Sequence, residues 1–185
     1  MKNFIKEGQK LPLYGIGPHL VAGMALVTLA GILLTPNLLR SGAVSGAWRI
    51  IFHTLGGLLM VLGLAVWLIS AKGSGMDESI AENKLKTDGI YAWVRNPMYS
   101  GLWLLMAGIC LQWCNAWLLA IPFLNWALMT AVLKHTEEKW LSELYGPAYA
   151  AYCRRVNRCW PWFPRKDPVH TLQGTGTRHG RGDRT

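Results

Sequence analysis

Four apolar runs constrain this chain more than any other feature: residues 18–38, 50–69, 97–114 and 116–134. A helix needs about 20 apolar residues to cross the hydrocarbon core of a bilayer. Of the 185 residues, 51% are hydrophobic and only 16% are charged. We therefore expect an all-α integral membrane protein with four transmembrane helices and a helical C-terminal segment outside the bilayer.

Lysine and arginine are unevenly distributed among the segments that flank these runs. The N-terminal arm holds three, residues 35–49 two, residues 70–98 four, the 114–116 turn none, and the segment from Lys134 onward ten. Because cytoplasmic loops carry the excess of Lys and Arg, we expect both termini and the 70–98 loop in the cytoplasm, as in a bacterial inner membrane protein. The formal net charge of +9 suits anionic lipid headgroups, and no nucleic-acid-binding motif accompanies it.

The domain organisation is simple. Residues 1–164 are expected to form one membrane domain, in which cytoplasmic helices at 135–145 and 147–156 follow the fourth span. Residues 165–185 are rich in Gly, Thr and Arg without apolar periodicity, which predicts a disordered tail. The N-terminus reads as a retained cytoplasmic end. Neither a metal site nor a disulfide is expected from the four cysteines, Cys110, Cys114, Cys153 and Cys159.

The most chemically crowded stretch is KTDGIYAWVRNPMYSG, residues 86–101. Gly89 is predicted to make a turn, and Asn96-Pro97 to start a helix in which the asparagine caps free N–H groups. With Arg95 beside it, such a helix N-terminus suits an anion. An ordinary capped loop with an Arg/Tyr anchor at the membrane interface explains the same residues.

Two acidic residues follow the fourth span. Glu137 and Glu138 are able to bind the hydroxyls or the ammonium group of a ligand. Taken alone, however, they are better explained as a solvated pair balanced by Lys134 and Lys139. His135 and Glu138 have the i, i+3 spacing of metal ligands but lack a second ligand pair.

Three features of the spans bear on their packing. His53 lies inside the second run, where it either snorkels or bonds to a neighbour. Gly56, Gly57 and Gly63 permit a close approach of another helix. Pro122 is expected to kink or weaken the fourth run.

Taken in order, GIYAWVRNPMYSG, a tight apolar hairpin and HTEEKWLSELYGPAYAAYCRRVNRCWP resemble the isoprenylcysteine carboxyl methyltransferase-like and phospholipid methyltransferase family of membrane enzymes. The resemblance covers roughly residues 85–164. The family pattern is matched by Gly89, Tyr91, Arg95, Asn96, Pro97, Tyr99, Glu137, Glu138, Gly146, Tyr149, Tyr152, Arg158 and Pro161. One departure is Asn96, where well-known members carry histidine.

This resemblance implies a methyltransferase that binds S-adenosylmethionine over the last two spans, at the cytoplasmic membrane face. It implies catalytic roles for Arg95, Asn96, Glu137 and Glu138. The implied cofactor-binding residues are Gly89, Tyr91, Arg95, Asn96, Pro97, Tyr99, Glu137, Glu138, Tyr149 and Tyr152. Arg95 suits the cofactor carboxylate, the glutamates its ammonium or ribose hydroxyls, and aromatic faces its adenine or sulfonium.

The methyl acceptor stays open among lipophilic or small carboxylates, thiols and amines. Two other functions are compatible with the same segments. An NADPH-dependent membrane reductase of sterol-reductase-like design shares the C-terminal arrangement. A non-catalytic membrane scaffold or carrier accounts for the apolar runs and the cations, but not for the clustered polar motif.

Overall fold

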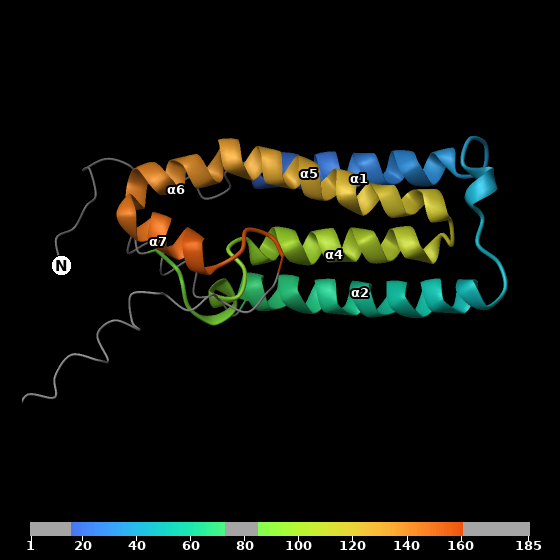
Figure 1. The fold of residues 1–185 in the computed structure, drawn as a ribbon, viewed down its shortest axis with the longest axis horizontal. Coiled ribbons are helices and arrows are strands. Elements are labelled where there is room, and N and C mark those ends of the chain that lie inside the picture. The colour runs from blue at the N-terminus through green and yellow to red at the C-terminus, as the bar shows by residue number, and fades with distance from the viewer. Residues whose placement is uncertain (1–15, 73–84, 161–185) are drawn as a thin grey trace, which may run out of the picture.

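The computed structural model describes residues 16–72 and 85–160, which form a bundle of helices (Figure 1). The α-helices are α1 (Gly17–Leu34), α2 (Ala47–Lys72), α4 (Pro97–Gln112), α5 (Ala120–His135), α6 (Glu137–Tyr145) and α7 (Pro147–Arg155). Short 3₁₀ turns occur at η1 (Arg40–Gly42), η2 (Gly89–Ala92) and η3 (Ala116–Leu119). Only isolated bridges, and no β-strand, occur among these described residues, so the all-α expectation is confirmed for them.

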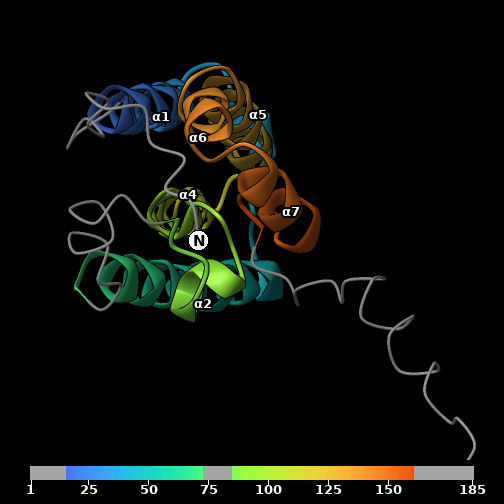
Figure 2. The same ribbon diagram turned by 90° about the vertical axis from the view of Figure 1, so that its left-hand side faces the viewer.

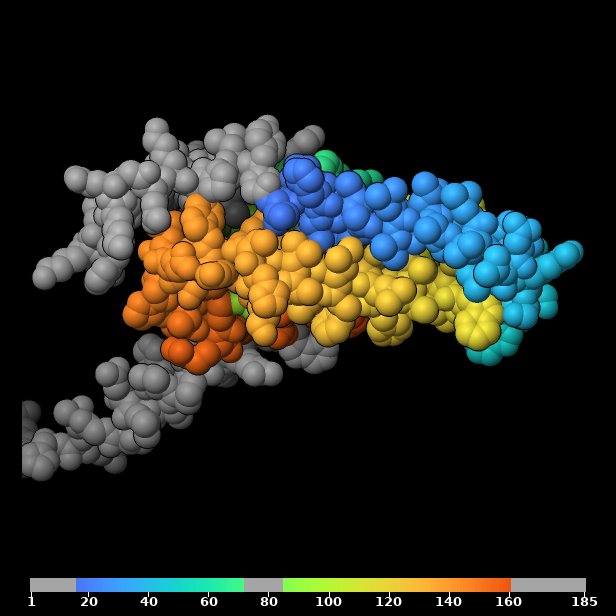
Figure 3. Space-filling model, turned by 90° about the horizontal axis from the view of Figure 1, so that it is seen from above, coloured from blue at the N-terminus to red at the C-terminus, as the bar shows by residue number. Residues whose placement is uncertain are grey.

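The four long helices lie side by side with α4 in the middle. Seen end-on, α2 covers one side of α4, while α1 and α5 cover the other (Figure 2). The space-filling view shows α1 running alongside α5 and α6 over one face of the bundle (Figure 3). Helices α6 and α7 gather with η2 at the end of the bundle where α4 begins (Figure 1).

Within the described part of the chain, three helical stretches are long and apolar enough to cross a membrane: Gly17–Leu34, Ala47–Ala71 and Ala116–Tyr145. Their outward faces expose large apolar side chains such as Leu29, Leu58 and Phe123, as expected where lipid replaces water as the solvent. The chain is therefore an integral membrane protein. Helix α4 is shorter, with 16 residues, and its side chains are the most enclosed of the long helices.

The contact between α2 and α4 is made by glycines spaced seven residues apart on each helix. Gly56 faces Gly108, and Gly63 faces Gly101. A Cβ placed on Gly63 would lie 2.6 Å from the backbone oxygen of Gly101, so only glycine lets the two backbones approach this closely. The close approach predicted for Gly56 and Gly63 is confirmed. Gly57 points elsewhere, because its Cβ would meet only Gln112 Nε2, at 3.9 Å.

Polar contacts also fix α5 inside the bundle. The buried Asn125 donates from Nδ2 to Thr28 Oγ1 of α1 (2.9 Å), and Trp103 Nε1 of α4 donates to the carbonyl of Pro122 (2.7 Å). Pro122 lies in the first turn of α5, just after η3. In the first turn of a helix, the N–H that proline lacks would have no intrahelical partner. The irregularity expected at Pro122 therefore lies where the 3₁₀ turn changes to the α-helix.

The helix bounds differ from expectation in two places. Helix α1 ends at Leu34 and not near 38. Thr35 still has α-helical angles (φ −56°, ψ −46°), but Pro36 has no N–H with which to continue the helical hydrogen bonds. The helix of the fourth run extends to His135 and then breaks at Thr136, where φ is −121° and ψ is −89°. Gly146 separates α6 from α7 with φ +51°, a left-handed conformation that favours glycine. The predicted tail, 165–185, lies outside the described residues.

Candidate functional site

The site is organised by two segments that are far apart in sequence and run side by side. Arg95 N donates to Asn157 O (2.9 Å) and Asn96 N to Arg158 O (3.1 Å), and Val94 forms a parallel bridge with Asn157. The buried Ser100 hydroxyl donates to Cys159 O (2.7 Å). The chain after α7 is thereby fixed against the first turn of α4.

Asn96 differs from the prediction in its bonding. Helix α4 begins with Pro97 as expected, but the Asn96 side chain makes no capping bond to it. Its Nδ2 donates instead to Arg158 O (3.1 Å), reinforcing the bond from its own backbone N–H. The predicted capping role is therefore wrong. An amide that already bonds to the neighbouring segment has lost the freedom needed to cap its own helix.

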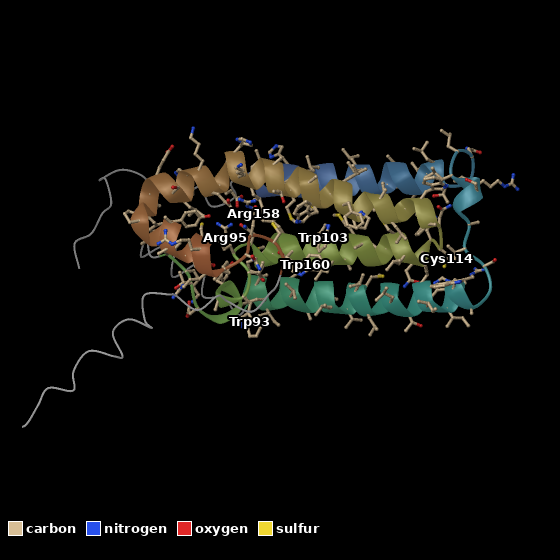
Figure 4. All side chains as sticks on the ribbon, in the orientation of Figure 1. Trp93, Arg95, Trp103, Cys114, Arg158 and Trp160 are labelled. Carbon is tan, nitrogen blue, oxygen red and sulfur yellow. The ribbon has the colours of Figure 1, made fainter. Side chains whose placement is uncertain are left out.

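Two arginines converge on one carboxylate. Arg158 binds Glu138 through both ends of its guanidinium fork, with Nε 2.7 Å from Oε1 and Nη2 2.8 Å from Oε2. Arg95 Nη2 lies 3.3 Å from the same Oε1. Figure 4 shows Arg95 and Arg158 at the end of the bundle occupied by α6 and α7. Glu138 is buried, so the solvated pair with Lys134 and Lys139 is not what forms.

This arginine–glutamate cluster (Arg95, Glu138 and Arg158) places two guanidinium groups against one carboxylate. The Arg95 side chain is only 9% exposed, and its Nε is buried without a hydrogen-bond partner among the described residues. A buried donor of this kind is costly to leave unpaired. The cluster therefore has both excess positive charge and an unused donor, the features that bind an anionic group.

Aromatic and thiol groups of α7, and of the segment that follows it, line the cluster. Tyr149 and Tyr152 lie on the predicted common face, with ring centroids 6.2 Å apart. Burial, and then the Glu138 carboxylate, raise the pKa of Tyr149, so its hydroxyl stays a neutral donor. Cys153 Sγ accepts from Arg95 Nη1. Burial raises the pKa of the Cys159 thiol to about 12, which keeps it protonated at neutral pH.

Glu137 points to a different partner from Glu138. The Tyr99 hydroxyl of α4 donates to Glu137 Oε1 (2.6 Å). Gly17, at the start of α1, packs directly on this tyrosine, since a Cβ there would lie 2.7 Å from the Tyr99 hydroxyl. The two glutamates thus join α6 to two separate parts of the molecule.

A further bond ties η2 to α7: Tyr152 donates its hydroxyl proton to the backbone oxygen of Tyr91 (2.6 Å). Gly89 has φ +57° at the start of this turn, as predicted. Gly89 itself is exposed, so it shapes the turn that carries Tyr91 and lies apart from the ion cluster.

Not all predicted site residues occupy one place. Arg95 and Glu138 belong to the cluster, and Tyr149 lines it. Asn96 and Pro97 adjoin it through the backbone, and the other residues position the surrounding elements. Sequence reasoning assigned no role to Arg158 or Cys153. Arg158 matched the family pattern, but its partner is 20 residues away along the chain, beyond any helical spacing.

Comparison with known proteins gives one result. The model of the family described as phospholipid methyltransferase matches residues 51–148. This range includes Arg95, Glu137 and Glu138 and ends just before Tyr149. No curated protein and no solved structure matches the chain significantly.

Proposed function

The chain belongs to the phospholipid methyltransferase family, and on that premise we propose that it transfers a methyl group from S-adenosylmethionine to a lipophilic or small acceptor at the cytoplasmic membrane face. The observation that carries the proposal is the arginine–glutamate cluster, with its excess positive charge and the unpaired Nε of Arg95. A largely buried guanidinium with one unpaired N–H donor suits the carboxylate of an amino-acid-like ligand.

Each residue is assigned by the bonds it already makes. Both oxygens of Glu138 are bound by Arg158, so we assign Glu138 to holding the arginines in place. Glu137 accepts a hydrogen bond from the Tyr99 hydroxyl at Oε1 only. It is therefore a better acceptor than Glu138 for an ammonium group or for ribose hydroxyls. The buried rings of Tyr149 and Tyr152 supply apolar faces for an adenine or a sulfonium.

When bound, S-adenosylmethionine would supply a methyl group on a positively charged sulfur. The lone pair of the acceptor would attack this methyl carbon in line, with the neutral thioether as the leaving group. The protein's contribution is alignment, which is worth roughly 7–11 kcal/mol in favourable cases. A carboxylate or thiolate acceptor needs no general base, whereas a protonated amine needs one. Glu137 is the candidate, because Glu138 is already bound by the arginines.

The proposed topology has four spans, with α4 as the third. At 16 residues α4 is about 24 Å long, and it gains a covering from α2, α1 and α5 that the lipid-facing helices lack. The lysine and arginine distribution supports a cytoplasmic location for the end with α6 and α7. The soluble cofactor would then reach the site from the cytoplasm, and a lipophilic acceptor would reach it from the bilayer.

Calorimetric titration of the full-length protein in detergent with S-adenosylmethionine or its demethylated product tests the proposal. We expect binding, and we expect Arg95→Ala to weaken it by at least about tenfold through loss of one charge-assisted contact. The bundle should stay folded, because Arg158 still pairs with Glu138. Arg154→Ala, on the exposed side of α7, is the matched control.

Absence of binding by the folded wild-type protein would refute the cofactor assignment, and binding of NADPH in its place would favour a reductase. The acceptor is identified separately. Membranes containing the protein are incubated with radiolabelled S-adenosylmethionine, and the label is followed into lipid, protein or a volatile small molecule. A scaffold function would leave all three fractions unlabelled.

A further inference from the structure

A second cluster of reactive side chains lies at the far end of the bundle from Arg95 and Arg158. Figure 4 shows Cys114 there, where α4 ends. Its Sγ lies 3.3 Å from Nε2 of His53, on the second turn of α2. The other ring nitrogen of His53, Nδ1, lies 2.8 Å from Oε1 of Gln112. Together the three residues form a thiol–imidazole–amide arrangement that methyl transfer does not use.

The bonds of Gln112 fix which nitrogen of His53 carries the proton. Gln112 Nε2 donates to the backbone oxygen of His53 (3.0 Å), and a carbonyl oxygen accepts only. The amide nitrogen must therefore face that carbonyl, which leaves Oε1 to accept from Nδ1–H. In the neutral imidazole, Nε2 then presents its lone pair to the Cys114 thiol. This is the order of groups that activates a nucleophile: thiol, base and orienting side chain.

The backbone also holds Cys114 in an unusual conformation. Cys114 is the only non-glycine residue of the described chain with a positive φ, 46°. Its carbonyl accepts from Val44 N (2.8 Å), and the next residue, Asn115, donates from its side chain to Leu39 O (2.7 Å). Bonds to the α1–α2 connection therefore hold the strained residue in place, and such strain is concentrated at functional sites.

The other cysteines have different surroundings. Cys153 and Cys159 lie at the end with the arginine–glutamate cluster, where Cys153 contacts Arg95 and Cys159 is buried beside α4. Cys110 is almost fully buried in α4. Within residues 16–72 and 85–160, a thiol–imidazole contact is recorded for Cys114 alone. Cys114 itself is 8% exposed, and its partner His53 is exposed. A reagent that reacts with the sulfur must therefore approach it from the side of the imidazole.

We propose that Cys114 is a histidine-activated thiol that exchanges with low-molecular-weight disulfides. The Cys114 proton passes to His53 Nε2, and the thiolate attacks one sulfur of the disulfide. A new S–S bond forms to Cys114 while the original S–S bond breaks. The departing thiolate takes the electron pair and recovers the proton from His53. In the proposed topology this end faces the non-cytoplasmic side, where disulfides persist.

The test is brief exposure of the folded, full-length protein in detergent to 5,5′-dithiobis(2-nitrobenzoate) or glutathione disulfide at pH 7. After quenching and digestion, mass spectrometry measures the modified fraction at each cysteine. An unassisted thiol is only a few per cent ionised at this pH, so activation raises its rate by at most about 30-fold. We expect Cys114 to react about tenfold faster than the half-buried Cys153.

Substitution of the base separates activation from mere access. His53→Asn should slow Cys114 by about tenfold, whereas His135→Asn, an exposed histidine at the other end, should leave its rate unchanged. Gln112→Leu serves as the test if His53→Asn fails to fold. It keeps His53 but removes the bond that orients the ring, and it should slow the reaction of Cys114 several-fold. Equal labelling of Cys114 and Cys153, or an unchanged Cys114 rate in either folded variant of the cluster, would overturn the proposal.

Discussion

At the scale of single residues, Glu138 has the environment that most restricts substitution. Its carboxylate is buried and paired on both oxygens with arginine. Removing one member of a buried ion pair leaves the other charge uncompensated, which usually costs more than the pair contributes. Here the guanidinium groups of Arg95 and Arg158 both pair with this carboxylate, and the Arg95 side chain is only 9% exposed.

Glu138→Gln is therefore expected to lower the free energy of unfolding by about 3 kcal/mol, the usual cost of breaking a buried pair. Thermal unfolding in detergent measures the effect. Glu143→Gln, which changes an exposed glutamate of the same helix, should be nearly neutral. Equal stability of the two variants would show that Glu138 does not hold the arginines.

Cys159 gives a second prediction at this scale. Burial raises the pKa of its thiol to about 12, and the thiolate is the reactive form. Since the folded-state pKa lies above the usual value, the thiol stays protonated throughout the neutral range. Iodoacetamide at pH 8 should therefore leave Cys159 unmodified in the folded protein and alkylate it after denaturation, as followed by mass spectrometry. Rapid alkylation of the folded protein would contradict the burial of this thiol.

At the scale of elements, the α2–α4 contact depends on glycines facing one another. Gly63→Ala is expected to destabilise the bundle by about 1–3 kcal/mol, because the new methyl group would overlap the backbone of α4. Gly57→Ala, six positions earlier on the same helix, has room for the methyl group and is the matched control. Thermal unfolding of the two variants should differ clearly, and similar midpoints would argue against the close contact.

The sequence predicted these elements well where one physical effect dominates. Hydropathy located α1, α2 and α5, and the glycine spacing predicted the approach of another helix to Gly56 and Gly63. The bond made by Asn96 was beyond prediction, because an Asn-Pro pair has the same local signature whether or not its amide caps the helix. Arg158 was likewise matched to the family pattern without a role, since its contact depends on the chain after α7 returning beside residues 94–96.

At the scale of the whole molecule, the two ends of the bundle differ in charge and chemistry. The end with α6 and α7 holds the arginine–glutamate cluster, and the opposite end holds the Cys114–His53–Gln112 arrangement. Of the 19 lysines and arginines, only two, Arg40 and Arg49, belong to the 35–49 connection at the latter end. Such asymmetry predicts that this end faces away from the cytoplasm.

Reporter fusions test the proposed topology. Green fluorescent protein fused to the C-terminus should fluoresce in bacterial cells, because it folds in the cytoplasm. Alkaline phosphatase inserted within residues 35–46 should be active, because it folds only after export. The reverse pair of results would contradict the proposed orientation, and with it the cytoplasmic location of the arginine–glutamate cluster.

The pairing of residues 94–96 with 157–158 also sets an order of events during synthesis. All the long helices precede Arg158 in the chain, so they are made and available for insertion before Arg158 leaves the ribosome. Until then Glu138 lacks its bidentate partner, and the first turn of α4 lacks the segment that bonds to it. The membrane-spanning part is therefore built first, and the proposed methyl-transfer site is completed last.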